Sequence, residues 1–408
     1  MGALDTSASK SNLIAWLTMK LFLGLGPGDI VGARRAALAG EAIQETSIAF
    51  SEQLFSFCRA QGIAVLAISS NSRRDELTDG SIRIENRPHL LRGSGIRFHM
   101  AMLTYAAYLA FRARRFGADI AIIDSGTTHY FALTAFWLLG IPVAVNLHNV
   151  LWPSGFPPDG RVSRTIFSLN AMFFRHIAVG AVGVSPECER QVRTVARYPV
   201  PFYQYRCQFL EQGFRSGKPY QGGTFRIAFV GRAEMDKGLL DLIDIANQLR
   251  SASNPKFVFD VCGDGTALSE LRKKVDDCGL HDLLIIHGRL ERSRLLDIYA
   301  NAHAVIVPTR STFCEGMPQA CAEATLSCLP VVTSQVTNAF DVIGLACVRA
   351  ETNDIDSYVR AIRSLVERPE FYDRLRSECP SLSKQFVDME QGYGAAVRRL
   401  ISDLFPNR

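Results

Sequence analysis

The chain has 408 residues, of which 48% are hydrophobic and 21% are charged, and its formal net charge is +5. This length is too great for one hydrophobic core, so we expect two domains with the composition of an ordinary globular protein. No run of 18 apolar residues occurs, so we expect no membrane-spanning helix.

The positive charge is concentrated in the first half of the chain. Residues 1–220 contain 23 Lys and Arg against 15 Asp and Glu, whereas residues 221–408 contain 22 against 25. Many of the first-half cations lie between Arg73 and Arg115. This asymmetry favours an anionic membrane surface or an anionic acceptor as a partner of the first half, but an ordinary solvated surface explains it equally well. We expect no nucleic-acid partner.

The ten cysteines form no CxxC pair, which is typical of a protein in a reducing cytosol. Cys314, Cys321 and Cys328 are seven residues apart, but no histidine accompanies them, so we interpret them as small core residues. We therefore predict a cytoplasmic protein, with peripheral association at the inner membrane face left open.

The first half alternates predicted strands and helices. Residues 13–21 are predicted as the first strand, followed by a glycine-rich turn at 24–28 and one long helix over 36–60. Further strands are predicted at 63–69, 118–126, 141–149 and 178–185, and further helices at 98–116 and 164–177. This alternation is typical of a parallel sheet covered by helices.

The alternation stops and then begins again after a segment rich in proline and glycine. We predict strands at 225–230, 257–262, 283–288, 303–308 and 329–334, with helices at 239–250, 269–278 and 292–301. The expected organisation is a first domain at 1–205, a linker at 206–224, a second domain at 225–380, and a C-terminal helix within 381–408 that crosses back to the first domain.

Two cations follow the first strand of the second half. The run FRIAFVGRAEMDKG places Arg232 directly after Gly231, and Lys237 directly before Gly238. Arginine offers a planar fork for two phosphate oxygens and lysine offers a point charge, while the glycines let the backbone approach a ligand. Fixed cations can stabilise a departing diphosphate without a metal ion. We expect no metal, because the only DxD pattern, Asp354 to Asp356, has the position of a helix N-cap.

Two glutamates follow another strand end, in the run PTRSTFCEGMPQACAEATLSCLPVV. Glu315 lies in a loop, and Pro318 is expected to open the helix that carries Glu323. Glu323 is surrounded by alanine and cysteine, so we expect it to be buried and to need a partner. A ribose diol, with two adjacent hydroxyl donors, would suit such a carboxylate.

These motifs resemble the family-4 retaining glycosyltransferases of the GT-B fold, within the group 1 glycosyltransferases. The resemblance covers about residues 225–334, and its most specific part is the pair Glu315 and Glu323 with seven residues between them. It implies two doubly wound, Rossmann-like domains that face a central cleft. It also implies a metal-independent reaction that retains the anomeric configuration, with a nucleotide-diphosphate sugar as co-substrate and no cofactor.

The resemblance also implies roles for individual residues. Arg232 and Lys237, after Gly231, would hold the donor diphosphate, while Glu315 would contact the transferred sugar and Glu323 the ribose. The remaining expected donor contacts are the backbone of Met317 and Pro318, the turn at Leu290 against the base, and Gly265.

The first half resembles the family more loosely. His148, in the run NLHN, stands where the family often has a strand-end histidine facing the sugar, although such a histidine is equally often a core or turn residue. Gly26 and Gly28 are the candidates for the acceptor loop, and the sequence does not decide which of them contacts the acceptor.

The sequence thus predicts a hexosyltransferase that acts on a hydroxyl of a glycan or lipid-linked glycan, in cell-surface polysaccharide or glycolipid synthesis. His148 and Glu315 are the expected catalytic residues. Two alternatives stay open at this point: a nucleotide-sugar 2-epimerase of the same shape, and a catalytically silent subunit that binds sugar nucleotides or glycans.

Overall fold

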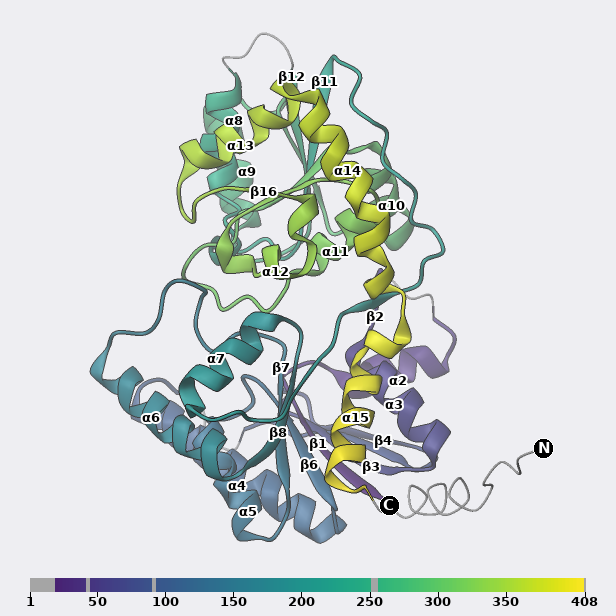
Figure 1. The fold of residues 1–408 in the computed structure, drawn as a ribbon, viewed down its shortest axis with the longest axis vertical. Coiled ribbons are helices and arrows are strands. Elements are labelled where there is room, and N and C mark those ends of the chain that lie inside the picture. Colours follow the sequence, from purple (N-terminus) through teal and green to yellow (C-terminus); the bar gives the residue numbers. More distant parts are fainter. Residues whose placement is uncertain (1–18, 42–44, 90–92, 251–255, 407–408) are drawn as a thin grey trace, which may run out of the picture.

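The computed structural model describes residues 19–41, 45–89, 93–250 and 256–406. Within these ranges the chain forms two α/β domains, one above the other in Figure 1, each built on a mostly parallel sheet. Each sheet has its own buried apolar core, as the alternating apolar strands predicted. The prediction of two doubly wound domains is therefore confirmed.

The first domain contains an eight-stranded sheet in which only the edge pair β4–β5 is antiparallel. Helices α4, α5 and α6 cover one face of this sheet and α3 covers the other, as right-handed crossovers require. Helix α15 packs beside α3. The strands in spatial order are β4 (Asp75–Asp79), β5 (Ile82–Asn86), β3 (Ala64–Ser69), β1 (Lys20–Leu25), β6 (Ile120–Asp124), β7 (Val143–Leu147), β8 (Ala178–Gly183) and β9 (Phe202–Gln204). The helices are α2 (Ile30–Leu38), α3 (Phe50–Gln61), α4 (Ile96–Phe116), α5 (Thr134–Leu138), α6 (Arg161–His176) and α7 (Pro186–Ala196), with a 3-10 turn η1 (Tyr130–Leu133).

The second domain contains a six-stranded sheet whose strands are all parallel. Its spatial order is β13 (Leu284–Gly288), β12 (Lys256–Cys262), β11 (Thr224–Val230), β14 (Ala304–Val307), β15 (Val331–Thr333) and β16 (Cys347–Arg349). The direction of chain progress reverses between β11 and β14, and ligands of such sheets bind beyond the strand ends at that reversal. The helices are α8 (Asp241–Arg250), α9 (Leu268–Cys278), α10 (Arg292–Asn301), α11 (Gln319–Leu326), α12 (Phe340–Ile343), α13 (Ile355–Glu367) and α14 (Pro369–Ser383).

The chain crosses between the domains twice. It passes upward through β10 (Gln208–Phe209), which pairs with β2 (Ser47–Ile48) of the first domain. It returns after α14, and α15 (Tyr393–Leu404) then packs against α3, β8 and β9, as the yellow helices of Figure 1 show. The last helix of the chain is therefore part of the first domain.

The single helix predicted over 36–60 is wrong. The structure has two helices there, α2 and α3, with β2 between them. Gly40 has a left-handed φ of 71°, which ends a helix, and Asp29 caps the start of α2 by accepting a hydrogen bond from the Gly32 amide. Two helices and a connecting segment can carry a similar apolar pattern to one long helix, so periodicity alone did not separate them.

The predicted first strand needs a similar correction. Residues 13–18 of that prediction lie outside the described residues, and β1 occupies Lys20–Leu25. Gly24 therefore lies inside the strand and not in the turn. A Cβ at Gly24 would come within 2.7 Å of the Ile123 side chain on the neighbouring strand. The glycine turn that follows β1 begins at Gly26.

The basic segment between Arg73 and Arg115 contains many acid-paired arginines. Arg83, Arg87 and Arg112 surround the fully buried carboxylate of Glu85 at 2.8, 3.0 and 2.7 Å. Three of the nine arginines in this segment therefore neutralise a buried acid of the sheet edge.

Candidate active site between the domains

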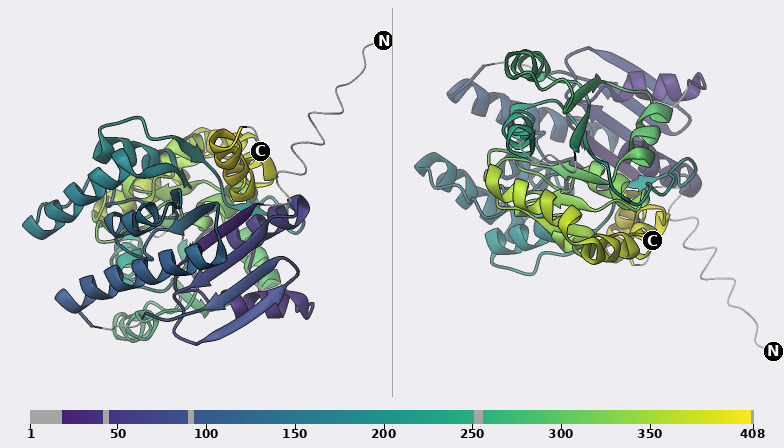
Figure 2. Two further views of the ribbon diagram at one scale, coloured as in Figure 1. Left: turned by 90° about the horizontal axis from the view of Figure 1, so that it is seen from below. Right: turned by 90° about the horizontal axis from the view of Figure 1, so that it is seen from above.

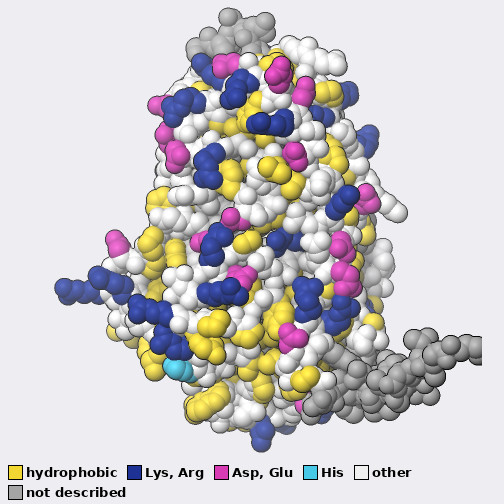
Figure 3. Space-filling model, viewed as in Figure 1, with side chains coloured by type: hydrophobic (Ala, Val, Ile, Leu, Met, Phe, Trp, Pro, Cys, Tyr) yellow, Lys and Arg dark blue, Asp and Glu magenta, His cyan; other side chains and the backbone are white. Residues whose placement is uncertain are grey.

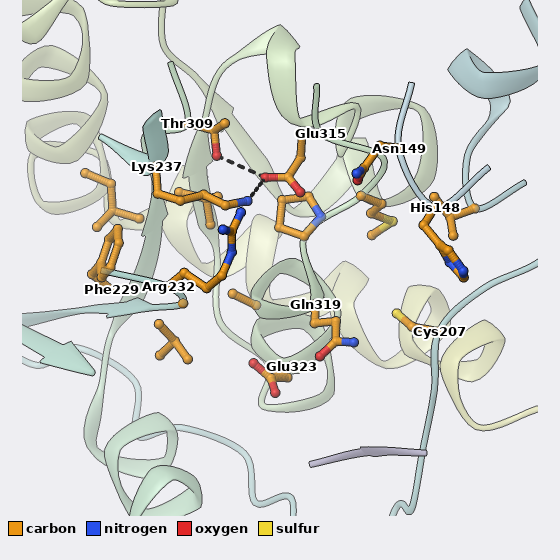
Figure 4. Close-up of a pocket in the computed structure, with 18 of the residues that line it drawn as sticks. His148, Asn149, Cys207, Phe229, Arg232, Lys237, Thr309, Glu315, Gln319 and Glu323 are labelled. Atoms are coloured by element: carbon orange, nitrogen blue, oxygen red, sulfur yellow. Dashed lines mark hydrogen bonds and ion pairs between the residues drawn. The ribbon is translucent and has the colours of Figure 1, made fainter. Parts of the chain in front are cut away.

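A cavity of about 360 Å³ lies between the domains, at the carboxyl ends of β7, β11 and β14. Figure 4 shows its wall, to which the second domain contributes most of the charged side chains and the first domain contributes His148 and Asn149. Eight of the residues predicted from the sequence line this cavity: His148, Gly231, Arg232, Lys237, Glu315, Met317, Pro318 and Glu323. The residues that the sequence assigned to one site are therefore far apart in the chain but close together in space.

The two cations are positioned by the turn after β11. A short 3-10 turn, η2 (Met235–Lys237), ends at Gly238, whose φ is 71°. A Cβ at Gly238 would lie 2.1 Å from the carbonyl oxygen of Pro308, so only glycine lets this turn pack against the end of β14. The close approach brings Lys237 next to the loop that carries Glu315.

Lys237 and Glu315 form an ion pair across the cavity wall. The Lys237 Nζ donates to Glu315 Oε2, and the Thr309 hydroxyl donates to the same oxygen at 3.3 Å (Figure 4). Both charged side chains are largely buried, with exposed fractions of 16% and 7%. A phosphate would therefore have to compete with the Glu315 carboxylate for Lys237.

Phe313 orients both cations, and sequence reasoning did not identify it. Its ring lies 4.1 Å from Lys237 Nζ and 5.2 Å from the Arg232 guanidinium carbon, measured to the ring centroid. These are cation–π distances, and they hold the two cations on the same side of the cavity. The only sequence sign of this role was an aromatic residue in the loop before Glu315.

Asn338 fixes the loop around Glu315, and it too was missed. Its amide donates to the carbonyl oxygens of Glu315 and Gly316 at 2.5 and 3.1 Å, while the hydroxyl of Ser154 donates to its side-chain oxygen. Ser154 belongs to the first domain. The loop that carries Glu315 is therefore held from both sides of the cleft.

Glu323 is buried on α11, as the sequence predicted, and both of its oxygens have partners. Thr46 donates to Oε1 and Tyr299 donates to Oε2. Burial raises the pKa of the Glu323 carboxyl above its usual 4.5, and the two hydroxyl donors oppose that shift. Pro318 is the N-cap of α11 and the helix begins at Gln319, one residue later than expected.

His148 belongs to a hydrogen-bond network in the first domain. Its Nδ1 lies 3.0 Å from the Tyr205 hydroxyl, and its Nε2 lies 2.9 Å from Asn146 Nδ2 and 3.2 Å from Asp124 Oδ2. The Phe50 ring lies tilted against the imidazole, with 4.9 Å between centroids. Both ring nitrogens thus have protein partners, and the network fixes the ring at the cavity wall.

The two domains touch closely beside His148. A Cβ added to Gly316 would lie 1.9 Å from the carbonyl oxygen of His148, so glycine is required at position 316 for this contact. A larger residue would push the loop that carries Glu315 away from the end of β7.

Gly26 and Gly28 line a second, smaller cavity of about 250 Å³ that shares Phe50 and His148 with the first. Most of its wall is apolar, formed by Leu23, Leu25, Ile30, Leu54 and Tyr393 among others. A Cβ at Gly26 or Gly28 would meet nothing within 4 Å, so packing within the protein requires neither glycine. The histidine therefore stands between a charged cavity and an apolar one.

Residues 214–380 match the family model described as "Glycosyl transferases group 1". The chain carries a group 1 glycosyltransferase domain. A curated relative, D-inositol 3-phosphate glycosyltransferase of Xylanimonas cellulosilytica, is 32% identical over 110 residues. That alignment covers 27% of this chain and only 26% of the relative.

Solved structures extend the likeness beyond the group 1 glycosyltransferase domain to the whole fold. Sucrose-phosphate synthase from Thermosynechococcus elongatus superposes with a TM-score of 0.69 at 14% identity, covering 96% of this chain and 100% of that one. HepE from Anabaena, in complex with UDP, gives a TM-score of 0.66 at 14% identity over 95% and 100%. The lipopolysaccharide outer core galactosyltransferase WaaB gives 0.65 at 14% identity over 95% and 100%. The predicted GT-B fold is confirmed, and the narrower placement in family 4 stays a prediction.

Two predicted donor residues of the group 1 glycosyltransferase domain do not line the central cavity. Gly265 packs against the turn after β11, where a Cβ would lie 2.5 Å from the Ala233 carbonyl oxygen, so packing alone explains this glycine. Leu290 is half-buried after β13 and outside the cavity wall. Their contacts with a nucleotide remain predictions.

The DxD pattern of the group 1 glycosyltransferase domain caps a helix, as predicted. Asp354 precedes α13 and accepts a hydrogen bond from the Ser357 amide at 2.9 Å.

Of the three evenly spaced cysteines, Cys321 is buried as predicted, whereas Cys314 and Cys328 are only partly buried.

Proposed function

We propose that this protein is a retaining glycosyltransferase that moves a hexose-type sugar from a nucleotide-diphosphate sugar to a hydroxyl group of a glycan or lipid-linked glycan. The observation that carries the proposal is the meeting of Arg232, Lys237, Glu315 and Glu323 in one cavity at the reversal point of the second sheet. Cations there suit a diphosphate, and carboxylates suit sugar and ribose hydroxyls. Synthesis of a cell-surface polysaccharide or glycolipid, on a membrane surface, is part of the proposal.

The donor would lie with its diphosphate against Arg232 and Lys237. As the bond from the anomeric carbon to the phosphate oxygen breaks, negative charge grows on the leaving group, and these fixed cations stabilise it. Glu323 would hold the ribose and Glu315 the transferred sugar. HepE has been solved with UDP and with UDP-glucose, but at 14–15% identity that likeness shows the fold, so the donor assignment depends on the charges in this cavity.

The acceptor would enter through the cavity lined by Gly26 and Gly28. Its hydroxyl would reach the anomeric carbon beside His148, where the two cavities meet. A departing phosphate oxygen on that same face would accept the acceptor proton, which accounts for retention of configuration. His148, fixed by Asp124 and Tyr205, would position the sugar and would not move a proton itself.

The test is donor turnover measured with and without an acceptor glycan. The proposal expects sugar transfer only when the acceptor is present, with the anomeric configuration of the donor kept in the product. Conversion of the donor at its second sugar carbon without acceptor would instead identify an epimerase. Tight donor binding without any turnover would identify a binding subunit.

Arg232→Ala is expected to weaken nucleoside-diphosphate binding by about 1.5–3 kcal/mol, because one charge-assisted contact to phosphate is lost. Isothermal titration calorimetry measures this directly. Arg294→Ala, on the exposed surface of α10, is the matched control and should leave the affinity unchanged. Unchanged affinity in Arg232→Ala would remove this residue from the diphosphate site.

Transfer is expected to need no divalent metal, because the fixed cations neutralise the leaving group and Asp354 is occupied as a helix cap. The measurement is transfer activity in excess chelator, after prior removal of metal ions. Full loss of activity that magnesium or manganese restores would contradict the proposed leaving-group chemistry.

A further inference from the structure

The outward face of α4 is apolar. Ile96, Met100, Leu103, Ala107 and Phe111 are spaced four, three, four and four residues apart, so they lie along one side of the helix, and all are exposed. Ile96 is 82% exposed and Phe111 is 59% exposed. The opposite side of α4 packs into the core, so this helix is apolar on both sides, unlike an ordinary surface helix.

The neighbouring helices extend this apolar surface. On α5, Trp137 is 58% and Leu138 is 71% exposed, and on α6, Val162 is 66% and Met172 is 62% exposed. Helices α4 and α6 both pack against η1, which leads directly into α5, at one end of the first domain (Figure 2, left). Hydrophobic and Lys or Arg side chains are interspersed in the lower left of Figure 3, where Figure 1 places these helices.

The arginines of this face differ from those at the sheet edge. Within the described part of the chain, the guanidinium groups of Arg114, Arg115, Arg161 and Arg164 have no hydrogen-bond or ion-pair partner, and all four residues are exposed. The sequence has no acidic residue from 87 to 118, or from 160 to 186. The positive charge here is therefore not neutralised by the protein itself.

We propose that this α4–α6 face, formed by the exposed apolar residues and the four arginines just named, docks on an anionic lipid bilayer. Exposed apolar side chains would enter the boundary between headgroups and acyl chains, and the arginines would meet lipid phosphates. A second copy of the chain is a poorer match, because a symmetric contact would bring the same unneutralised cations together. In the described residues no helix is long and apolar enough to cross a bilayer, so the docking is to one surface.

This inference gives a location to the membrane association proposed above, and it does not depend on sugar transfer. The full chain is mixed with neutral phosphatidylcholine vesicles, or with vesicles that also contain phosphatidylglycerol, at low and high salt, without donor or acceptor. Sedimentation should show binding to the anionic vesicles that falls as salt rises. If binding persists while the protein proves inactive as a transferase, the proposed function fails and the docking surface stands.

Paired variants locate the surface. Each lost arginine should lower the partition coefficient about fivefold, so Arg114→Ala/Arg115→Ala and Arg161→Ala/Arg164→Ala should each lower it roughly twenty-five-fold. Lys273→Ala/Lys274→Ala, on the exposed side of α9 in the second domain, is the matched control and should bind like the unaltered protein. An equal loss in the control pair would mean that net charge, and not this face, drives binding.

Trp137 reports whether the apolar side chains enter the lipid. Its emission should shift to the blue when anionic vesicles are added, and Trp137→Phe should remove most of that shift while vesicle binding persists. No binding to anionic vesicles, or binding that is equal for neutral lipid and unaffected by the arginine variants, would overturn the proposal. A lipid-free dimer that Leu138→Ser dissociates would also overturn it, because the face would then be an interface between copies.

Discussion

Glu315→Gln is expected to tighten the binding of a free nucleoside diphosphate while lowering sugar transfer about tenfold or more. The carboxylate of Glu315 holds Lys237 through a largely buried ion pair. Glutamine keeps the shape of the side chain but removes its charge, so the lysine ammonium becomes fully available to phosphate. The transferred sugar, by contrast, loses a charged hydrogen-bond acceptor that the proposed reaction uses.

Calorimetry with the nucleoside diphosphate and a single-turnover transfer assay separate the two effects. Lys237→Met should act in the opposite direction on the free nucleotide, because it removes the cation and leaves Glu315 buried with Thr309 as its remaining side-chain donor. Breaking a buried pair on one side costs about 3–5 kcal/mol of stability, so thermal unfolding of Lys237→Met should be lowered too. The double variant Lys237→Met/Glu315→Gln should recover most of that stability. Weaker nucleotide binding in Glu315→Gln would contradict the proposal that Glu315 competes with phosphate for Lys237.

Local sequence patterns were sufficient for the second domain's half of the site. One strand, β11, is followed by Gly231, Arg232 and Lys237, and another, β14, is followed by Glu315 and Glu323. The ends of these parallel strands lie together because the two strands are neighbours at the reversal point. Short stretches of the sequence are therefore enough to predict both the chemistry of these residues and their position in the fold. The same logic predicted most strands and helices of the second domain closely.

The residues that hold the site were harder to predict, because their partners are distant in the chain. Thr46 lies 277 positions from Glu323, and Ser154 lies 184 positions from Asn338. Nothing in the sequence near Thr46 distinguishes its hydroxyl from that of any other threonine. The hydroxyl that contacts a buried carboxylate is determined by the relative placement of the two domains. No local sequence pattern predicts that placement.

The polar edge of the first sheet was missed for another reason. Strands β4 and β5 consist of DELTD and IRIEN, whose charged residues resemble a surface loop. The buried Glu85 is stable there because three arginines surround it, and those arginines come from β5, the segment after it, and α4. The basic segment that we connected with a membrane therefore has two populations, paired at this edge and unpaired on the α4–α6 face.

Glu323→Gln is expected to weaken nucleoside-diphosphate binding about 10- to 100-fold while stabilising the ligand-free protein at neutral pH. The ribose diol would lose a charged acceptor, whereas the folded chain would no longer bury a charge. Because burial raises the folded-state pKa of this carboxyl, the folded protein binds more protons than the unfolded chain, so the stability contributed by Glu323 falls as pH rises above about 4.5. The stability advantage of Glu323→Gln should therefore grow from pH 4.5 towards neutral pH. Thermal unfolding across that range measures it, with the exposed Glu367→Gln as the matched control.

Thr46 distinguishes a ribose role for Glu323 from a purely structural one. Its hydroxyl, from the first domain, donates to the same carboxylate that the ribose would engage. Thr46→Val keeps the shape and removes the donor, which leaves Glu323 Oε1 without its hydroxyl donor until a nucleotide arrives. Nucleoside-diphosphate affinity should then rise several-fold while the melting temperature falls, since the unpaired carboxylate destabilises only the empty state. If Thr46→Val lowers stability but leaves nucleotide affinity unchanged, the ribose does not compete for that oxygen, and Glu323 serves to join the two domains.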